Sequence, residues 1–492
     1  MTDKTNEFSV EKADKYINAN SSLVKSRFRH TYHVTPPIGW MNDPNGFSMA
    51  AGKYHLFFQF YPYDSAWGPM HWGHYVSDDL IKWNWVKTAI APDSFYDKDG
   101  CFSGSAIEKG DKQYLFYTAV CDGIQTQASA VSSDGKVYVK NGVIISGDKL
   151  PAGCSRRDFR DPYVFERDGK YYMICGSMAE DKDGQLLLFS SCDLNDWKFV
   201  GVVRKDGKTT SGIYECPCVV AIGNKDVIIT SPQGYLTEDG RYQNVNSSIY
   251  SVGKLDLKSG KFTIEYEDEI DGGLDFYAPQ VLKSSDGRAI MIAWMQTWSR
   301  TMPTSSDGWA GACTLARSIT FKDGKLIQSP VAEIERYRKN PVEYKDIDLN
   351  GRTVLKGVCG VKIEMSVKIS IGNSDNVGIK LFESENNYAV IYYSAKEGKV
   401  FFDRSHTGVK IDCDKKEKDA YVRFVNVKDK CGVISFRIFL DESSCEAFIN
   451  DGEKVMTSNV YTKENGEGIS FFADGKGAKI ISLEKYDVVV QK

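Results

Sequence analysis

Three carboxylates lie in short polar motifs that are spread over the first half of the chain. The motifs are 40–46 (WMNDPNG) with Asp43, 159–165 (FRDPYVF) with Asp161, and 214–217 (YECP) with Glu215. Two carboxylates that flank a glycosidic bond are the minimum for its hydrolysis, because one attacks the anomeric carbon or activates water while the other protonates the leaving oxygen. The chain therefore carries the residue types that a glycosidase needs.

The sequence around each carboxylate favours a different role. Asp43 precedes Pro44, which fixes the backbone, and a glycine follows soon after and permits a turn. Glu215 has apolar neighbours, and the desolvation that they predict suits a proton donor. Arg160 precedes Asp161, and an adjacent guanidinium favours an ionised carboxylate that binds sugar hydroxyls.

Aromatic residues are dense around these motifs: Trp40, Phe60, Tyr61, Trp67, Trp72, Phe102, Tyr214, Tyr277 and Trp294. Sugars present C–H faces that pack on such rings, while polar groups fix their hydroxyls. A purely structural role in the core is the alternative, and for Phe60 and Tyr61 the two interpretations are even. Trp67 lies in a loop rich in glycine and proline, 61–73 (YPYDSAWGPMHWG), and is predicted to face a ligand.

A short phrase recurs five times at intervals of about 60 residues, as a turn, a basic residue and then an apolar strand. The copies start at Gly52, Asp111, Gly169, Lys225 and Gly287, and each follows a polar motif. A strand-rich repeat of this length predicts the blades of a β-propeller. If the phrase forms the second strand of each blade, the polar motifs lie on the first strands, surround the axis and converge on one funnel.

A second repeat keeps the same period. Its copies are 77–83 (SDDLIKW), 132–135 (SSDG), 191–197 (SCDLNDW) and 255–257 (LDL). Asp and Asn favour turns because their side chains bond to nearby backbone, so we expect these segments between the third and fourth strands. Chance is the alternative, and the shared period of two independent phrases argues against it.

The remaining segments predict a second domain. Residues 9–19 have weak helical spacing, and 332–338 (AEIERYR) is the best candidate for a connecting helix that stops at Asn340-Pro341. Alternating strands follow at 361–370, 388–395, 420–427, 433–441, 445–451 and 477–488. We expect an all-β chain with a five-bladed β-propeller at 28–338 and a C-terminal β-sandwich at 345–492.

The composition excludes several classes of function. A net charge of −4 at pH 7 offers no attraction to nucleic acid or to an anionic membrane. The polar N-terminus lacks an apolar signal segment and the twelve cysteines show no paired spacing, so we expect a cytoplasmic protein with reduced thiols. His71 and His74 have the spacing of two metal ligands but no complementary pair, so we expect no metal, and nothing indicates a cofactor or a serine nucleophile.

Six motifs in order resemble glycoside hydrolase family 32, the family of invertases, inulinases, levanases and sucrose-6-phosphate hydrolases. They are 33–46 (HVTPPIGWMNDPNG), 72–83 (WGHYVSDDLIKW), 102–106 (FSGSA), 159–162 (FRDP), 214–217 (YECP) and 275–280 (DFYAPQ). The resemblance covers about 28–338 and continues through 437–461. It implies a five-bladed propeller followed by a β-sandwich, and a retaining mechanism on β-fructofuranosides.

The resemblance also implies roles for single residues. Asp43 would be the nucleophile that forms a fructosyl-enzyme, Glu215 the acid/base, and Asp161 a ligand of the fructose hydroxyls that stabilises the transition state. Other positions match the lining of the fructose subsite: Asn42, Gln59, Trp67, Phe102, Ser103, Arg160 and Trp294. At Ala316-Arg317-Ser318 the chain departs from the Pro-Arg-Glu run of many relatives, which leaves the shape of that blade edge open.

The chain is similar to intracellular sucrose-6-phosphate hydrolases in its length and its lack of a signal segment. We therefore expect an exo-acting enzyme that hydrolyses sucrose 6-phosphate, sucrose or short fructo-oligosaccharides, with no nucleic-acid or membrane partner and with homo-oligomerisation left open. Alternatives are a transfructosylase, a fructan-degrading hydrolase of the inulinase or levanase type, and an inverting propeller glycosidase with a wider carboxylate separation. A lectin with a decayed site is disfavoured because all three carboxylates are present.

Overall fold

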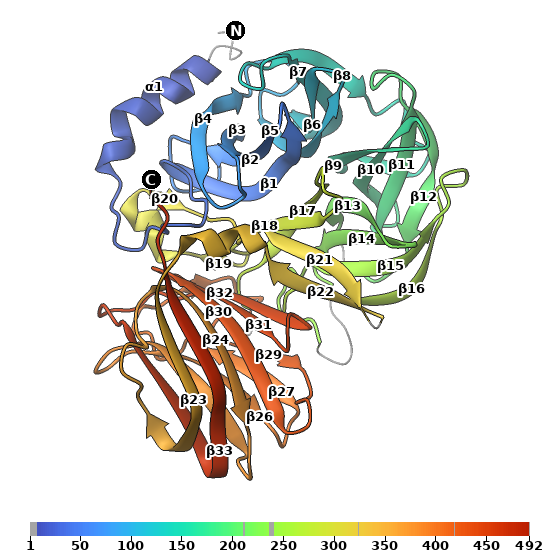
Figure 1. The fold of residues 1–492 in the computed structure, drawn as a ribbon. Helices are drawn as coiled ribbons and strands as arrows, with labels where there is room; N and C mark the ends of the chain where they lie inside the picture. The colour runs from blue at the N-terminus through green and yellow to red at the C-terminus, as the bar shows by residue number, and fades with distance from the viewer. Residues whose placement is uncertain (1–6, 210–211, 236–240, 323, 418, 492) are drawn as a thin grey trace.

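The computed structural model describes residues 7–209, 212–235, 241–322, 324–417 and 419–491. Five sheets surround an axis in the upper part of Figure 1, and a second β-domain lies below them. No helix in the described ranges is long and apolar enough to cross a membrane. The predicted fold class, a five-bladed propeller followed by a β-sandwich, is confirmed.

Each blade is formed by consecutive strands. The first contains β1 (Gly39–Ala50), β2 (Lys53–Tyr61), β3 (His71–Ser77), β4 (Trp83–Ile90) and the added β20 (Trp309–Ala310). The second contains β5 (Gly100–Lys109), β6 (Lys112–Cys121), β7 (Ile124–Ser132) and β8 (Val139–Ile145). The third contains β9 (Cys154–Arg167), β10 (Lys170–Ala179), β11 (Gly184–Ser191) and β12 (Lys198–Lys205).

The last two blades complete the ring. The fourth contains β13 (Tyr214–Ile222), β14 (Lys225–Pro232), β15 (Ile249–Leu255) and β16 (Phe262–Glu269). The fifth contains β17 (Tyr277–Lys283), β18 (Ala289–Trp294), β21 (Arg317–Lys322) and β22 (Lys325–Pro330). The innermost strands β1, β5, β9, β13 and β17 contact one another in turn, and β17 contacts β1, which closes the circle.

Both sequence repeats occupy the places that were predicted for them. The apolar phrase forms the second strand of every blade, β2, β6, β10, β14 and β18. The Ser-Asp segments form the turns between third and fourth strands. In the first blade, Ser77 Oγ accepts the backbone N–H of Leu80, and Asp79 Oδ1 accepts those of Ile81 and Lys82. The turns at Ser132 and Ser191 repeat this pattern. The second sequence repeat therefore arises because each of these turns needs Ser and Asp side chains to accept its backbone N–H groups.

The helical segments are short. The helix α1 (Val10–Asn20) begins after Ser9, whose hydroxyl accepts the N–H of Lys12, and it packs against β4. Three 3₁₀ turns are described: η2 (Ser21–Leu23), η3 (Pro303–Asp307) and η4 (Ala332–Tyr337). The predicted connecting helix is therefore the 3₁₀ turn η4, which ends before Asn340-Pro341 as predicted, but a strand and not a loop follows it. The backbone there continues as β23 through a bulge, because proline is tolerated where a strand irregularity removes the need for an N–H.

The second domain is a sandwich whose two layers belong to one hydrogen-bonded sheet. Its strands are β23 (Arg338–Thr353), β24 (Lys362–Ser370), β25 (Asn376–Glu383), β26 (Ala389–Ser394), β27 (Lys399–Asp403), β29 (Val422–Asn426), β30 (Val433–Asp441), β31 (Ser444–Ile449), β32 (Lys454–Asn459) and β33 (Gly468–Val488). The long β33 pairs with β25 near its start and with β24 near its end, so it passes from one layer to the other. A continuous apolar core fills the space between the layers. The short β28 (Asp412–Cys413) pairs instead with β19 (Arg300–Thr301) of the propeller.

Buried ion pairs join the two domains. Arg317 of β21 lies 3.0 Å from Glu446 of β31 through its Nε and 2.8 Å from Asp271 through its Nη1. Glu446 also lies 2.8 Å from His33, whose other ring nitrogen lies 2.9 Å from Asp441. All five side chains are fully buried or nearly so. Arg317, the central residue of the divergent triplet, is thus part of the domain contact.

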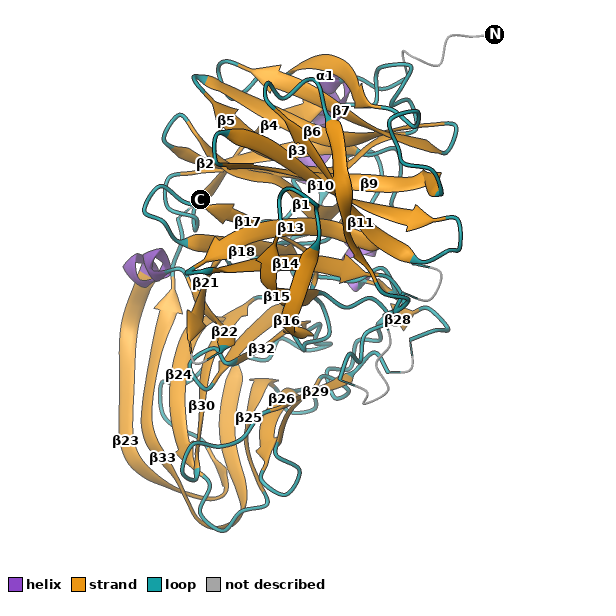
Figure 2. Ribbon diagram, turned by 90° about the vertical axis from the view of Figure 1, so that its right-hand side faces the viewer, coloured by secondary structure: helices purple, strands orange, loops and turns teal. Residues whose placement is uncertain are grey.

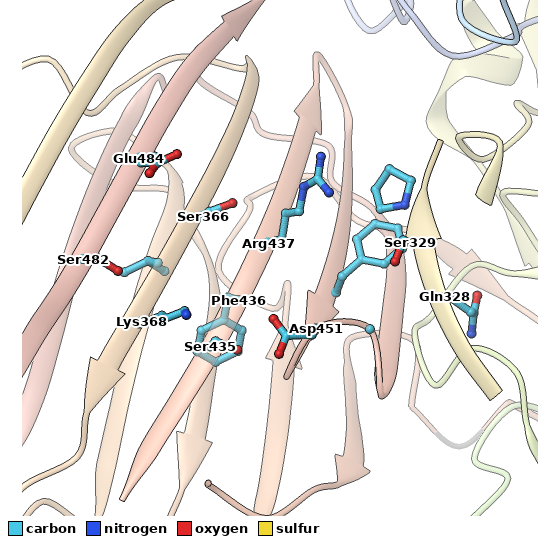
Figure 3. Close-up of a pocket in the computed structure, with 14 residues that line it drawn as sticks. Gln328, Ser329, Ser366, Lys368, Ser435, Phe436, Arg437, Asp451, Ser482 and Glu484 are labelled. Atoms are coloured by element: carbon cyan, nitrogen blue, oxygen red, sulfur yellow. The ribbon is translucent and has the colours of Figure 1, made fainter. Parts of the chain in front are cut away.

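A groove of about 380 Å³ remains open at one side of this contact. Figure 3 shows it between Gln328 and Ser329 of β22 and the outer face of the sandwich, where Lys368, Arg437 and Glu484 lie on neighbouring strands. Figure 2 shows the same junction from the side, with β22 above β24 and β30. None of the three motif carboxylates lies in this groove.

Candidate active site

A β-bulge interrupts the innermost strand of every blade at its polar motif. The pairing register shifts at Asn42-Asp43 in β1, at Ser103 in β5, at Asp161-Pro162 in β9, at Cys216-Pro217 in β13 and at Ala278-Pro279 in β17. A bulge re-aims a side chain and ends regular pairing, and it is also where proline fits in a strand. Five equivalent bulges therefore turn polar side chains toward the axis.

Three of these bulges hold a residue in the left-handed region of the backbone map. The φ angles are +63° at Asp161, +47° at Cys216 and +49° at Ala278. Each residue precedes a proline, which itself disfavours helical backbone at that position. Non-glycine residues in such conformations cost on the order of 1–3 kcal/mol each and collect at functional sites. Within the five innermost strands, the strained non-glycine residues therefore lie at the bulges of the polar motifs.

The bulges open into a cavity of about 330 Å³ at the end of the propeller axis. Its lining contains nine of the ten predicted site residues: Asn42, Asp43, Gln59, Trp67, Phe102, Ser103, Arg160, Asp161 and Glu215. The three carboxylates, drawn from three blades, thus meet in one place. The tenth residue, Trp294, is fully buried and does not line the cavity.

Three lining residues were not predicted from the sequence: Gln125, Gln233 and Trp298. Trp298 is 37% exposed and stacks on Trp40, while Trp294 packs behind it at a ring distance of 5.0 Å. Trp298 lies only four residues after the predicted Trp294, so the nearby second tryptophan in the sequence was the one available signal. Gln125 follows a hairpin turn and carries no motif that could have identified it.

One carboxylate oxygen of Asp43 accepts hydrogen bonds, whereas the other has no partner among the described residues. Ser103 donates a hydrogen bond of 2.6 Å to Oδ2, and the thiol of Cys216 lies 3.5 Å from the same atom. Oδ1 is buried and has no hydrogen-bond partner among the described residues. Burial raises the pKa of Asp43 to about 6, the Ser103 hydrogen bond opposes this rise, and the charge of Glu215 adds to it.

Glu215 lies against polar partners rather than the apolar neighbours that its sequence context predicted. Arg160 approaches its Oε1 with Nε at 3.1 Å and Nη2 at 2.9 Å. The hydroxyl of Tyr277 lies 2.7 Å from Oε2. The difference arises because the bulge in β13 turns this side chain to the axis, while Ile213, Val219 and Val220 point into the blades.

Asp161 interacts electrostatically with both of the other carboxylates. The backbone N–H of Cys216 donates to its Oδ2 at 2.9 Å, and Thr118 accepts its own N–H. Burial raises the pKa of Asp161 to about 7, Arg160 opposes the rise, and the charges of Glu215 and Asp43 add to it. Burial and the neighbouring negative charges thus raise the pKa values of both Asp43 and Asp161 above the usual range of a carboxylic acid.

Aromatic and amide groups form the wall and the floor. Trp67 is 49% exposed at the rim and meets Phe102 edge-on at 5.8 Å. Below the carboxylates, Gln280 of β17 accepts the N–H of Phe47 in β1 and donates to the carbonyl of Gly104 in β5. This amide ties three inner strands together at the axis and favours a funnel that is closed at its inner end.

The two histidines with metal-ligand spacing point to different partners. His74 shares a 2.9 Å hydrogen bond with His55, and His71 lies 2.9 Å from the carbonyl of Pro69. In the described part of the chain, no group of three or more His, Cys, Asp or Glu side chains is arranged to hold a metal ion.

Comparison with protein families gives two matches that together span most of the chain. Residues 33–330 match the model of the glycosyl hydrolases family 32 N-terminal domain. Residues 333–487 match the model of the family 32 C terminal. The chain belongs to glycoside hydrolase family 32. It is therefore a glycoside hydrolase, and the resemblance inferred from the six motifs is confirmed.

Curated members of the family match over nearly the full chain. A sucrose-6-phosphate hydrolase of Bacillus subtilis is 36% identical, with 96% of each chain covered. A raffinose invertase of Escherichia coli is 34% identical, with 90% of this chain and 91% of its own covered. Their names describe the activities of those proteins.

Solved structures of the family share the fold. A sucrose-6-phosphate hydrolase from Lactobacillus gasseri superposes with a TM-score of 0.87 at 29% identity, and the match covers 98% of this chain and 99% of the other. A β-fructofuranosidase variant of Bombyx mori in complex with sucrose superposes with a TM-score of 0.83 at 32% identity, covering 98% of both chains.

Proposed function

We propose that this enzyme is a retaining, exo-acting β-fructofuranosidase that works through a covalent fructosyl-enzyme. The observation that carries the proposal is the free Oδ1 of Asp43, a buried carboxylate oxygen with no partner among the described residues in a cavity that also holds Glu215 and Asp161. A nucleophile needs one unencumbered oxygen, and the Ser103 hydrogen bond to Oδ2 fixes the direction of the other.

In the first step Asp43 Oδ1 bonds to the anomeric carbon of the fructosyl unit as the bond to the leaving oxygen breaks. Glu215 gives its proton to that oxygen, so the leaving sugar departs neutral. In the second step Glu215 takes a proton from water, whose oxygen bonds to the anomeric carbon and releases Asp43 as a carboxylate. Two inversions give retention of configuration.

Arg160 and Tyr277 have a positioning role in this scheme. Both donate hydrogen bonds to the Glu215 carboxylate and so fix its orientation. Asp161, fixed by the N–H of Cys216, has its remaining oxygen available for fructose hydroxyls. A closed funnel with one fructose-sized end supports release of terminal units.

Rescue with azide tests the pair of roles directly. Glu215→Ala should hydrolyse an aryl fructoside slowly at the second step, because no base activates water. Azide needs no base, so it should accelerate turnover and give the β-fructosyl azide. Asp43→Asn is the matched control and should show no such rescue. An α-configured azide from Glu215→Ala would contradict the assignment. Formation of the β-azide by Asp43→Asn would contradict it as well.

Sucrose 6-phosphate, sucrose and short fructo-oligosaccharides are the proposed substrates. The similarity to sucrose-6-phosphate hydrolases supports the first of these. Arg157 is the cation that we propose for the phosphate. It is exposed on β9, makes no ion pair with a described residue, and its Nη1 lies over Gly123, two residues before the cavity-lining Gln125.

Paired kinetics separate these substrates. Arg157→Ala should raise KM for sucrose 6-phosphate at least about tenfold and leave KM for sucrose unchanged, because one guanidinium–phosphate pair is lost. Arg156→Ala, whose side chain packs on Gly147, is the control and should change neither constant. Equal effects of the Arg157 change on both sugars would argue against a phosphate contact.

Transfer to sugar acceptors and fructan degradation remain alternatives for the same intermediate, and product analysis at high sucrose distinguishes them. A cytoplasmic location is part of the proposal because a transporter would deliver these small sugars. The domain division at 28–338 and 345–492 is proposed as well, with residues 338–344 paired into the sandwich through β23.

A further inference from the structure

A row of aromatic side chains crosses the outer face of one sandwich layer. The strand register places Phe472, Gly378, Tyr392, Phe401 and Phe424 opposite one another on β33, β25, β26, β27 and β29. The layer is the part of the second domain in Figure 2 that carries β25, β26 and β29. Gly378 is the only member of this row without a side chain. The row is therefore broken between Phe472 and Tyr392.

A cavity of about 560 Å³ opens on this face beside Gly378, lined by residues of β25, β26 and β33. Tyr392 and Phe472 form its two walls, and Val390, Tyr388 and His406 extend it along β26. An added Cβ at Gly378 would lie 2.5 Å from Cβ of Tyr392 and 2.7 Å from Cζ of Phe472, so only glycine leaves room for both side chains. The trough is thus formed by the faces of β25, β26 and β33 together with the adjoining loop residues Tyr388, Lys396, Glu397 and His406.

The rings along the trough are fixed by neighbours. Tyr392 stacks on Phe401 at 5.0 Å with an interplanar angle of 11°, which leaves its other face toward the trough. Tyr388 stacks on His406 at 4.8 Å and carries Lys380 over its ring at 3.8 Å. Fixed aromatic faces offer contact area at a small cost in side-chain entropy.

Polar groups line both ends of the trough. Asn376, Ser394 and Asp474 lie at one end, and Lys380 and His406 at the other. Asn376 and Lys380 are four residues apart on β25, so the distance between the ends is about 13 Å. The lining holds two lysines against three acids, Asp375, Glu397 and Asp474, so it has no excess of positive charge for an anion.

We propose that this trough is a second saccharide-binding site, separate from the catalytic funnel and not dependent on the function proposed for it. Aromatic walls pack on the C–H face of a sugar ring, and hydrogen-bonding groups at the ends take its hydroxyls. The volume lies in the range of about 300–1,000 Å³ that small-ligand sites occupy. The near-balanced charge selects a neutral sugar, and the length suits a short oligosaccharide.

The geometry disfavours an added peptide strand as the occupant. β25 and β26 are both paired on their two sides, so neither offers free backbone groups for strand addition. A second copy of this chain is the other possible occupant, and the experiment below separates it from a sugar.

The test uses the full chain with the Asp43→Asn change, which prevents turnover during the measurement. Calorimetric titration with sucrose, a fructose trisaccharide and maltotriose should reveal binding at two sites for at least one sugar. Adding Tyr392→Ala or Phe472→Ala should weaken the second site about tenfold or more and leave the first unchanged. With Asp43 intact, neither change should alter kcat or KM for sucrose.

Phe424→Ala is the matched control because it lies in the same aromatic row but outside the trough. It should leave both sites intact, and thermal melting should confirm that all variants are folded. A single site for all three sugars overturns the proposal, as does equal loss of the second site in the Phe424 variant. A change in oligomeric mass on Tyr392→Ala, without an effect on sugar binding, would assign this face to a second copy and also overturn it.

Discussion

Asp43 is placed where an ionised carboxylate is costly. Burial and the charge of Glu215 raise its pKa from 3.8 to about 6, and the strained bulges around it hold the other acidic groups close. In the mechanism proposed above, formation of the fructosyl ester would remove this unfavourable charge. The same arrangement predicts that activity falls as the pH drops through about 6, since the protonated acid cannot attack.

Asp43→Asn should abolish turnover while raising the thermal stability of the free enzyme above pH 6. A carboxyl whose pKa is raised on folding is protonated in the native state at low pH, so its cost is absent near pH 4. That cost grows between about pH 4 and pH 6, as the unfolded chain ionises first, and is on the order of 1–3 kcal/mol beyond that. Asparagine removes the ionisation. Calorimetric scans at pH 4.5 and 7.5 check this.

A matched Ser103→Ala variant completes that comparison. It removes the hydrogen bond that opposes the rise in the pKa of Asp43, so the acidic limb of the activity profile should move to higher pH. If Asp43→Asn melts lower than the parent enzyme at pH 7.5, the carboxylate is not a source of strain in the native state.

Glu215→Ala should lose activity mostly on substrates with poor leaving groups. Glucose departs from sucrose only when its oxygen is protonated, whereas a phenol of low pKa departs with little assistance. We therefore expect a drop of about 10²–10⁴ in kcat/KM for sucrose and a clearly smaller drop for an aryl fructoside, measured at the first step by release of the phenol. Equal losses on both substrates would contradict the acid role.

The bulged inner strands explain which residues of the site could be predicted from the sequence and which could not. Seven of the nine predicted lining residues lie in the motifs at the bulges, whereas Gln59 was inferred from the family resemblance and Trp67 from that resemblance and its loop. Trp298 and Gln125 could not be predicted, because their placement depends on packing between segments and not on a local pattern. The surroundings of Glu215 were misjudged for a related reason, since a bulge reverses which face of the strand meets the apolar blade.

Gln280→Leu tests whether ties between inner strands position the carboxylates. Leucine would leave the N–H of Phe47 and the carbonyl of Gly104 buried without partners, at a cost of about 2–4 kcal/mol in stability. Because Asp43 lies on the same strand as Phe47, kcat should also fall while KM changes less. Melting curves and sucrose kinetics measure the two effects.

Gln113→Leu is the control for that experiment. Gln113 is buried in the second strand of its blade and donates to Ser48 on the side away from the cavity. It should reduce stability by a similar amount and leave kcat unchanged. A parallel loss of kcat in both variants would show that stability alone limits activity.

The contact between the two domains contains buried ion pairs, so we expect the domains to unfold as one cooperative unit. Burial alone would lower the pKa of His33, but its hydrogen bonds with Asp441 and Glu446 outweigh that effect and raise it to about 9. Burial would raise the pKa of Glu446, yet Arg317 and His33 hold it at about 2. The repeats predicted each blade from local sequence. The sandwich's shared strand β33 and this network could not be predicted, since they join residues from 46 to 413 positions apart with no local pattern.

Glu446→Gln should destabilise the whole molecule by about 3–5 kcal/mol, because it leaves the charges of Arg317 and His33 buried with too few partners. His33 stabilises the parent enzyme below pH 6.5, and this contribution is lost as the pH rises through about 9. The parent enzyme should melt in one transition at pH 7, because the buried network joins both domains. Its stability should fall toward pH 9.5 as His33 loses its proton, and the stability of Glu446→Gln should fall less over that range. A chain truncated after Asn340 should be insoluble or far less stable.

Glu484→Gln, on the exposed face of the junction groove, is the control and should leave the melting temperature within about 1 °C of the parent. Independent melting of two domains in the parent enzyme, or an unchanged melting temperature in Glu446→Gln, would show that the buried network does not couple the propeller to the sandwich.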